Sequence, residues 1–381
     1  MFADRRPGRP PSRPDPGPAA HSDSGPASRH PFRSGFRPAF RSGLNRTFRS
    51  GLRRTFRHSV LVPLSAATLL ATGTGAWYAY GGDGPPDPGT ATVAPVAPVA
   101  ERMNLPWPSE GQSSVEVEGI GSLGTTGKQS PVPIASVTKV MTAYVILRNH
   151  PMRAGAPGAR LVADQQAADE SYSSAESTFP VLAGREYTQR QLMEFMMVAS
   201  ANNVARLLAR WDAGSQEAFV EKMNRTAAGL GMTHTTYTGA SGIETSTKST
   251  AADQLKLARA AMKDPAFRQI VATPTITAPG VGVPTRNTNK LLGRDGVIGL
   301  KTGSSTPAGG NLLWATTQEI AGTPRLILGV VLHQRADTNP ATGSAAAHEA
   351  SRTLISAVRD VLPPAVAQAP RPRKPPHPST G

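Results

Sequence analysis

The feature that most constrains this chain is an uncharged segment of 22 residues, 59–80, with the sequence SVLVPLSAATLLATGTGAWYAY. A helix of about 20 mostly apolar residues is long enough to cross a bilayer. Arginines precede the segment and aromatic residues lie at its far end, which is typical of a span whose N-terminus stays in the cytoplasm. These flanking residues are Arg53, Arg54 and Arg57, followed by Trp77, Tyr78 and Tyr80. We therefore expect a transmembrane signal anchor at 58–80, with a cleaved signal peptide and a secreted protein as the alternative.

The formal net charge of +15 lies at the two ends of the 381-residue chain. Residues 1–57 carry +10 and residues 371–374 carry +3, so that the remainder carries only +2. Phe-Arg-Ser-Gly repeats in the basic arm would suit stacking on nucleic-acid bases. A basic arm directly before a membrane span is better explained by membrane orientation and by contact with anionic lipid. We therefore expect residues 1–57 to form a disordered cytoplasmic arm, and we expect no nucleic-acid partner.

Composition divides the rest of the chain into three parts. Residues 81–106 are rich in Pro, Ala and Gly, which is typical of an extended tether, and residues 363–381 form a Pro-rich, basic tail for which we expect disorder. Between them, residues 107–362 have an ordinary globular composition and are numerous enough for one large domain. The chain has no cysteine, which excludes disulfides, thiolate metal sites and cysteine nucleophiles. Its histidines are scattered, and we expect neither a metal site nor a cofactor.

Apolar periodicity predicts an α/β domain of the α+β type. Alternating residues predict strands at both ends of the domain, and helical spacing predicts helices between them. The predicted strands are 113–120, 296–302, 312–317 and 326–332. Helices are predicted from 137 to 147, after the capping residues Thr188, Ser215 and Thr250, and over 345–361. This order predicts an antiparallel sheet built from the two ends of the domain, with helices packed on it.

One glycine-rich segment resembles a dinucleotide-binding loop. Residues 119–124 match G-x-G-x-x-G and follow a predicted strand. No helix is predicted after them, so no helix N-terminus is available to hold a pyrophosphate. We expect a hairpin turn there instead.

The motif Ser136-Val-Thr-Lys139 carries the first chemical signal. On a helix, residues three apart lie one turn apart on the same face. A serine hydroxyl needs a neighbouring base to become a nucleophile, and a lysine can be that base only when its amine is neutral. Burial and nearby positive charge both lower the pKa of a lysine. The two residues can therefore form a nucleophile and its general base.

Two further motifs follow in the chain, Ser200-Ala-Asn202 and Lys301-Thr302-Gly303. The third motif lies at the end of a predicted strand and supplies a second cation, a hydroxyl and a glycine beside which a substrate backbone can lie. Each motif alone is common in caps and turns, whereas all three in this order are specific.

Together these motifs resemble the signature of penicillin-binding proteins and serine β-lactamases. The residues near the motifs are similar to those of low-molecular-mass D-alanyl-D-alanine carboxypeptidases. The similar segments are 134–143, 230–232, 240–242, 249–253 and 287–292. The resemblance covers about 110–362 and implies a β-lactamase/transpeptidase-like fold, with an antiparallel sheet flanked by helices and an all-helical lobe. Together with the predicted anchor at 58–80, it implies a bacterial cell-membrane enzyme that crosses the membrane once, with its N-terminus inside and its catalytic domain outside the cytoplasm.

The resemblance implies a role for each motif residue. Ser136 would attack the terminal D-Ala-D-Ala carbonyl of a peptidoglycan stem peptide and form an acyl-enzyme, and β-lactams would acylate the same serine as covalent inhibitors. Lys139 would be the general base, Ser200 would relay protons to the leaving amine, and Asn202 would bind the peptide carbonyl. The third motif and its neighbour would contact the substrate, and the charge of Lys301 would help to keep Lys139 neutral. These residues are Lys301, Thr302, Gly303 and Ser304.

The chain departs from the family pattern at two places. Ala201 stands where the family usually has Gly, and Asn203 stands where it usually has Asp. The family's arginine for the substrate carboxylate has no counterpart in 336–340, because Arg335 lies a few residues early.

Three alternatives to a carboxypeptidase differ in how well the residues fit them. A class A β-lactamase needs a deacylating Glu in an E-x-x-L-N-like loop, but Glu244 is followed by Thr-Ser-Thr-Lys. An endopeptidase that cuts D-Ala crosslinks uses the same residues and is the nearest alternative. A weakly active wall-binding protein that recognises penicillin is the third.

Overall fold

The computed structural model describes residues 97–100, 103–278, 280 and 282–368. The predicted arm and anchor, most of the predicted tether, and residues 369–381 of the predicted tail lie outside the described residues. Within the described part, no helix is both long and apolar enough to cross a bilayer.

A five-stranded antiparallel sheet forms the centre of the domain, in the order β2-β1-β11-β10-β9. Its first two strands come from the start of the domain and the other three come from its end, as the sequence predicts. The strands are β1 (Gln112–Val117), β2 (Gly121–Thr126), β9 (Val297–Ser305), β10 (Gly309–Ile320) and β11 (Thr323–Gln334). β1 pairs with β11, so that Ser114 lies opposite Val330. This pairing joins the start and the end of the domain in one sheet.

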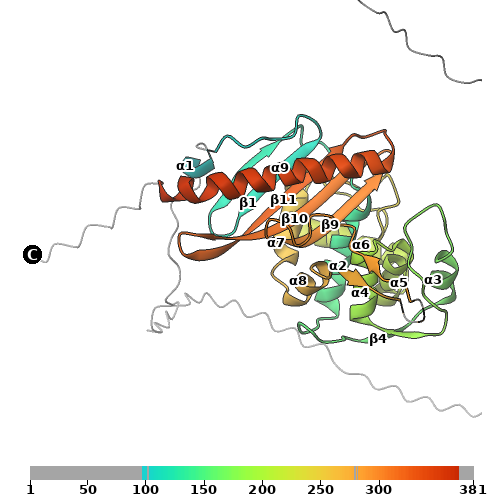
Figure 1. Cartoon of the computed structure of the whole chain (residues 1–381). Coiled ribbons are helices and arrows are strands. Elements are labelled where there is room, and N and C mark those ends of the chain that lie inside the picture. Colours follow the sequence, from blue (N-terminus) through green and yellow to red (C-terminus); the bar gives the residue numbers. More distant parts are fainter. Residues whose placement is uncertain (1–96, 101–102, 279, 281, 369–381) are drawn as a thin grey trace, which may run out of the picture. The chain divides into compact units, whose positions relative to one another are not determined.

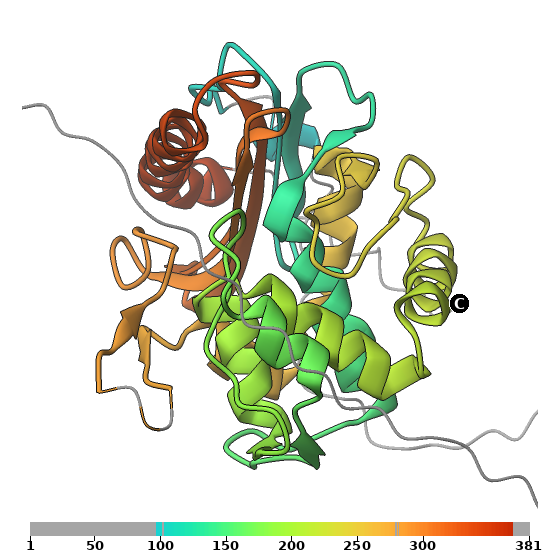
Figure 2. The same ribbon diagram turned by 90° about the vertical axis from the view of Figure 1, so that its right-hand side faces the viewer.

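Helices cover both faces of the sheet. Figures 1 and 2 show α9 (Pro340–Ala367) lying across one face, while α7 (Ala251–Ala261) and α8 (Pro265–Val271) lie on the other. The other helices form a lobe beside α7 and α8. They are α2 (Lys139–Asn149), α3 (Gln165–Glu170), α4 (Gln189–Val198), α5 (Asn202–Ala213) and α6 (Gln216–Gly229). The remaining elements are short: α1 (Ala97–Ala100), the 3₁₀ helix η1 (Ala135–Thr138), β3 (Val132–Pro133), β4 (Arg160–Val162), β5 (Glu186–Thr188), β6 (Lys248–Ser249), β7 (Thr275–Ile276) and β8 (Thr285–Arg286).

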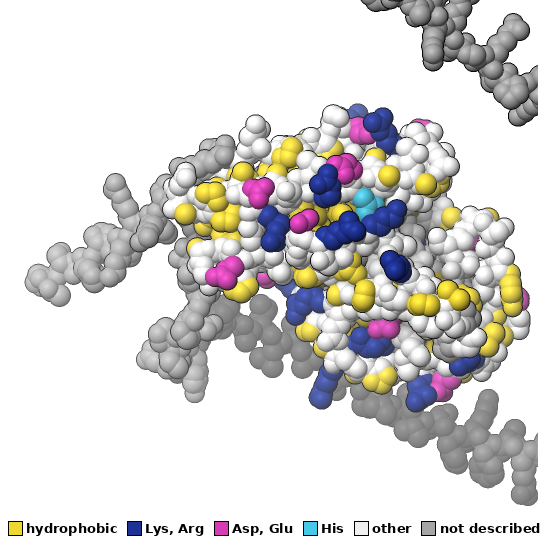
Figure 3. All heavy atoms as spheres, viewed as in Figure 1, with side chains coloured by type: hydrophobic (Ala, Val, Ile, Leu, Met, Phe, Trp, Pro, Cys, Tyr) yellow, Lys and Arg dark blue, Asp and Glu magenta, His cyan; other side chains and the backbone are white. Residues whose placement is uncertain are grey.

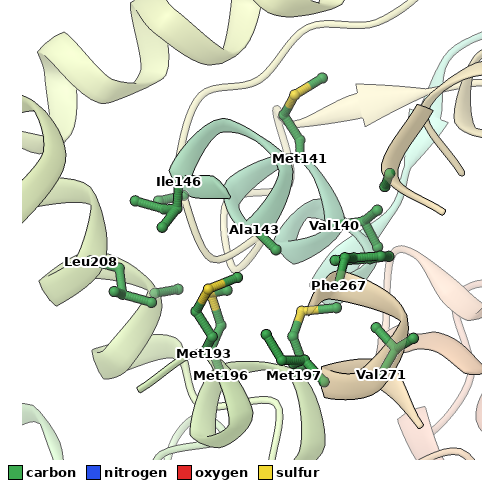
Figure 4. Packing of buried hydrophobic residues seen from close by; sticks show 14 of the residues in the cluster. Val140, Met141, Ala143, Ile146, Met193, Met196, Met197, Leu208, Phe267 and Val271 are labelled. Carbon is green, nitrogen blue, oxygen red and sulfur yellow. The ribbon is translucent and has the colours of Figure 1, made fainter. Parts of the chain in front are cut away.

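Alternation along β10 divides the core into two clusters. Leu313 and Ala315 face the cluster shared with the helical lobe, whereas Leu312 and Trp314 face the cluster under α9. Successive side chains of a strand point to opposite faces, so one strand serves both cores. Figure 4 shows the centre of the first cluster, where residues of α2 such as Val140 and Ile146 pack against Met193 of α4. The nucleophile motif at the start of α2 is thereby fixed to the interior.

The predicted helix caps form as the sequence indicates. Thr188 accepts a hydrogen bond from the Gln191 N–H, and the Gln191 side chain accepts one from the Thr188 N–H. Ser215 and Thr250 accept from the backbone three residues later. The glycine-rich segment 119–124 lies in the turn between β1 and β2 and in β2 itself, so the expected hairpin is confirmed.

The ordered fold extends beyond the predicted boundaries at 107 and 362. On the N-terminal side, Val99, Met103 and Leu105 are buried in the cluster under α9. The predicted tether thus ends in residues that pack on the domain, because their apolar side chains find a surface there.

The last helix also runs longer than predicted, from Asn339 as N-cap through Ala367. Pro363 lies inside it and has no N–H to donate to the carbonyl of Arg359. The side chain of Gln318 donates to that carbonyl instead, at 2.7 Å. A side chain from β10 therefore satisfies the acceptor that the proline leaves open.

Charges of both signs alternate on the face that carries α9. In Figure 3 the Lys and Arg side chains of this face are interspersed with Asp and Glu. This agrees with the charge of only +2 outside the two ends of the chain.

Gly329 of β11 gives a test of the packing under α9. A Cβ at this position would lie 2.0 Å from the Trp314 ring, which is fully buried. We expect Gly329→Ala to lower the free energy of unfolding by about 1–3 kcal/mol, measured by urea denaturation, because overpacking forces the core apart. Gly229→Ala is the control, since its Cβ would meet nothing within 4 Å. Equal stability of the two variants would contradict this account.

Candidate active site

The start of α2 places Ser136 and Lys139 side by side. Ser136 lies in η1 and is half-buried, whereas Lys139 is the first residue of α2 and its side chain is 0% exposed. Nζ of Lys139 lies 2.8 Å from Oγ of Ser136. The turn is held by the Thr138 hydroxyl, which donates to the Ala135 carbonyl at 2.8 Å. The first motif therefore brings a hydroxyl and an amine into hydrogen-bond contact, as the sequence predicts.

Two further oxygens complete the surroundings of the Lys139 amine. Nζ lies 2.5 Å from Oδ1 of Asn202 and 2.7 Å from the carbonyl oxygen of Ser241. Both oxygens only accept hydrogen bonds. A neutral amine has two N–H groups and one lone pair, so when it donates to these two oxygens its lone pair is left for the hydroxyl of Ser136. The site is thus arranged for proton transfer from the hydroxyl to the amine.

The surroundings of Lys139 favour its neutral form. Burial lowers the pKa of Lys139 well below its ordinary value, and the positive charges of Lys301 and Arg206 lower it further. The negative charges of Glu176 and Glu244 act in the opposite direction. An amine is a base only when it is unprotonated, so this lowered pKa suits a general base.

Ser200 and Asn202 reach the site from the start of α5. Asn202 is buried and contacts Lys139, while Ser200 is 6% exposed and has a left-handed backbone with φ of 62°. Ala201, which stands where the family usually has glycine, has φ of −64° and fits an alanine without strain. Among the described residues, the Ser200 hydroxyl has no hydrogen-bond partner, and the Lys301 amine bonds to the Thr302 carbonyl instead of to this hydroxyl.

The third motif runs along β9 against the nucleophile turn. A Cβ on Gly303 would lie 2.8 Å from the Ile134 carbonyl oxygen and 2.9 Å from the Ser136 nitrogen. Only a glycine permits this approach of two backbones. Thr302 is buried, and its hydroxyl donates to the hydroxyl of Thr288 at 2.7 Å.

Lys301 points inward from β9, and its amino group donates to the Thr302 carbonyl at 2.9 Å. It is 1% exposed, and burial lowers its pKa to about 7. Ser304 is the next exposed residue of the strand.

A cavity of about 480 Å³ opens above these residues. Its lining joins six segments of the chain: Ala135, Ser136, Ser174, Ala175, Glu176, Ser177, Asn202, Gly242, Ile243, Ser304, Ser305, Thr306 and Pro340. A larger cavity of about 980 Å³ lies elsewhere, among residues of β1, β11 and α7. We place the site in the smaller cavity, because Ser136 and Asn202 line it and neither lines the larger one.

Sequence reasoning gave no role to several residues of the site, although Ser241 and Gly242 lie in the family-like segment 240–242. Gly242 packs so closely on Ala135 that a Cβ would lie 2.0 Å from its carbonyl oxygen. Ser241 contributes only a backbone oxygen, which no motif can reveal. Glu176 and Arg206 lie beside Asn202, and nothing in their own sequence context indicated this.

The two departures from the family pattern have different outcomes. Asn203 uses its amide fully: Nδ2 contacts the carbonyl oxygens of Ala167 and Phe179 at 3.1 and 2.9 Å, and Oδ1 accepts from the Phe179 N–H at 3.1 Å. An amide both donates and accepts there, which a carboxylate would not do. Arg335 forms an ion pair with Glu110 at 3.2 Å and does not line the cavity.

Among the described residues no cluster of histidine and carboxylate side chains suits a metal ion. The arrangement therefore consists of a serine and hydrogen-bonding groups in the wall of one cavity, with the buried amine of Lys139 in contact with that serine and a second buried lysine on β9. Such a set can transfer an acyl group through a covalent serine intermediate.

Comparison with known proteins agrees with this chemistry. A sequence model of the family described as D-alanyl-D-alanine carboxypeptidase matches residues 123–335. D-alanyl-D-alanine carboxypeptidase DacB2 of Mycobacterium tuberculosis is 34% identical over 206 residues, which are 52% of this chain and 66% of that protein. The D-alanyl-D-alanine endopeptidase of Escherichia coli is 31% identical over 193 residues, 48% of this chain and 59% of that protein. The chain thus spans about two thirds or less of these two relatives.

Solved structures show the same fold. The Streptomyces K15 DD-transpeptidase aligns with a TM-score of 0.58 and 27% identity, covering 66% of this chain and 98% of that one. Penicillin-binding protein 6B of Escherichia coli aligns with a TM-score of 0.56 and 27% identity, covering 67% and 80%. The predicted fold class is therefore confirmed.

The lowered pKa of the buried Lys301 can be tested through the pH dependence of stability. Its pKa is about 7 in the folded chain and near 10.5 when unfolded, so the unfolded state binds more protons between these values. Stability therefore rises with pH across this window, by up to about 1.4 kcal/mol per pH unit for one group. We expect Lys301→Met to flatten the rise in free energy of unfolding between pH 7 and 9.5. An unchanged slope, with Lys263→Met as the exposed control, would contradict the burial of a neutral amine.

Proposed function

The chain belongs to the D-alanyl-D-alanine carboxypeptidase family, and on this premise we propose that Ser136 removes the terminal D-Ala from peptidoglycan stem peptides. The Ser136 oxygen attacks the carbonyl carbon between the last two D-Ala residues and forms an acyl-enzyme. The C–N bond breaks and free D-Ala leaves with a proton on its amine. Water then hydrolyses the ester, which releases the shortened peptide and regenerates the serine.

The observation that carries this proposal is the pair of Ser136 and Lys139. The amine is 2.8 Å from the hydroxyl, is fully buried, and has its pKa lowered by burial and by Lys301. It takes the proton of the hydroxyl during attack. The same geometry accounts for covalent inhibition by β-lactams, since their carbonyl can replace that of the peptide.

Ser200 and Lys301 carry the later proton steps in this proposal. Ser200 lies two residues before Asn202, which contacts Lys139, and its free hydroxyl can relay a proton to the leaving amine. Lys301 acts mainly through its charge, because it lowers the pKa of Lys139.

Substrate binding is assigned to Asn202, Ser136 and Ser304 in the cavity wall and to Thr302, which precedes the wall residue Ser304 by two positions on β9. Asn202 binds the peptide carbonyl, and Thr302 binds the terminal carboxylate. The backbone N–H groups of Ser136 and Ser304 form the oxyanion hole, which is supported by the close approach of Gly303 to the Ser136 nitrogen. Residues 336–340 contain no arginine, and Arg335 is paired with Glu110. No arginine from this region therefore assists Thr302.

We also propose where the enzyme acts. Its substrate belongs to the cell wall, and the predicted anchor 58–80 would hold the chain in the bacterial cell membrane with residues 107–362 outside the cytoplasm. Support comes from the basic residues before that segment and the aromatic residues at its end.

The reaction is tested with a fluorescent penicillin and a pentapeptide that ends in D-Ala-D-Ala. We expect the wild type to become labelled and to release D-Ala, and we expect Ser136→Ala to do neither. Lys139→Ala should lower the labelling rate by about 10²–10⁴-fold, as for loss of a general base. Equal labelling of the wild type and Ser136→Ala would overturn the mechanism.

The same assay separates the carboxypeptidase from an endopeptidase, the name that one of the relatives carries. Muropeptide dimers crosslinked through D-Ala are supplied beside the pentapeptide. Cleavage of the dimers with no release of free D-Ala would replace the carboxypeptidase by the endopeptidase.

The location is tested by replacing residues of the uncharged segment. We expect the full chain to sediment with membranes and to resist extraction by carbonate. Leu69→Arg together with Leu70→Arg should release it, because charges at the centre of a span cost about 2.5–3.5 kcal/mol each. A wild-type chain that is found only in the medium, without residues 1–76, would support the cleaved signal peptide instead.

A further inference from the structure

Glu176 places a carboxylate in the wall of the cavity, next to the amide of Asn202. Nδ2 of Asn202 donates to Oε2 of Glu176 at 2.7 Å. The side chain of Glu176 is only 13% exposed, and the residue lines the same cavity as Ser136. None of the three motifs includes this residue, and the proposed reaction gives it no step.

Arg206 of α5 holds the other side of this carboxylate. Its two terminal nitrogens donate to the two oxygens of Glu176 at 2.5 and 3.1 Å. Its Nε donates to Glu170 at 2.8 Å. Burial acts to raise the pKa of Glu176, but the hydrogen bonds and charge of Arg206 outweigh it and hold the pKa below the ordinary value. The carboxylate is thus ionised and can only accept hydrogen bonds.

The backbone around Glu176 is fixed as well. The Asn202 N–H donates to the Ser177 carbonyl at 2.8 Å, and Asn203 binds the loop through Phe179. The carboxylate therefore cannot move away from Asn202 without breaking several hydrogen bonds.

An ionised carboxylate determines which way the Asn202 amide points. If the amide were flipped, its oxygen would face the oxygen of Glu176 at about hydrogen-bond distance, and its NH₂ would face the amine of Lys139. Both contacts would be unfavourable. In the observed orientation, Oδ1 accepts from Lys139, one N–H binds Glu176, and the second N–H is left for a ligand.

We infer that Glu176 is a positioning residue that, together with Arg206, fixes the Asn202 amide with its oxygen on Lys139 and one N–H available to the substrate carbonyl. This rests on the proposed function, since the substrate contact of Asn202 belongs to it. Glu176 acts through Asn202 on both partners of the reaction, namely the base that takes the proton and the peptide bond that is attacked.

The ion pair also balances charge near Lys139. Four charged groups act on its amine: Lys301 from β9 and Arg206 from α5 lower its pKa, while Glu176 and Glu244 from the two loops raise it. Removing the charge of Glu176 alone leaves Arg206 in place, so the pKa of Lys139 falls further. A role in packing alone would not move this pKa.

The chain offers a matched control in Glu170. It binds the same arginine, with a side chain that is 19% exposed, but it does not contact Asn202 and is not among the groups that act on Lys139. Glu170 and Glu176 can each be changed to Gln and to Ala in the full chain. Their melting temperatures report the shared effect on folding.

The experiment measures the rate constant of acylation by fluorescent penicillin across pH 5–9, and D-Ala release from the pentapeptide. We expect Glu176→Ala to lower both second-order rate constants at least tenfold. Glu176→Gln should restore most of the rate, because its amide oxygen still accepts from Asn202. The acidic limb of its pH–rate profile should move to lower pH, because the pKa of Lys139 falls when the charge of Glu176 is removed. In Glu170→Ala and Glu170→Gln both rate constants should stay within about twofold of the wild type, and the acidic limb of the pH–rate profile should not move.

Two results would overturn the inference. One is an equal loss in the Glu170→Ala and Glu176→Ala variants, which would show that only loop docking matters. The other is an unchanged rate in Glu176→Ala.

Failure of the proposed function has a different signature, because then the wild type itself neither becomes labelled nor releases D-Ala. In that case the ¹³Cε resonance of Lys139 is titrated by NMR. A lower pKa of Lys139 in Glu176→Gln than in Glu170→Gln supports the effect of the Glu176 charge on Lys139 without any substrate. Equal pKa values of Lys139 in the two variants overturn it.

Discussion

The buried amine of Lys139 is the contact on which the rest of the site depends. It joins three segments that are far apart in the chain: the nucleophile turn through Ser136, the start of α5 through Asn202, and the loop after α6 through the Ser241 carbonyl. A buried charged lysine would be costly, whereas a neutral amine with two acceptors and one donor is fully satisfied. The condition that makes burial tolerable is therefore the condition that makes the amine a base.

The sheet provides the second constraint, because it brings the third motif to the first. β9 is an edge strand, and Gly303 allows it to lie against η1 at a distance that no side chain would permit. β9 is paired with β10, and β10 contributes side chains to both core clusters. Movement of β9 relative to α2 would therefore disturb both clusters. The position of the Ser136 nitrogen relative to Ser304 is thus set by the packing of the whole domain.

Much of this could be predicted from local signals. The capping box at Thr188 and the turn between β1 and β2 depend on residues that are close in sequence, and they form as expected. The last helix extends six residues beyond its predicted end at 361, where two prolines would normally stop a helix. Gln318 from a distant strand compensates for Pro363, and no local pattern contains such information.

The same distinction explains which site residues the sequence could indicate. Ser136 and Lys139 are three residues apart on one turn, so their contact follows from helical geometry. Glu176 is 26 residues from Asn202 and reaches it only because Asn203 and the Ser177 carbonyl fix the loop. A contact of this kind depends on the tertiary structure, and a carboxylate in such a loop would ordinarily be taken for a solvated surface residue. The part of the site that controls the base from a distance is therefore the part that only the fold reveals.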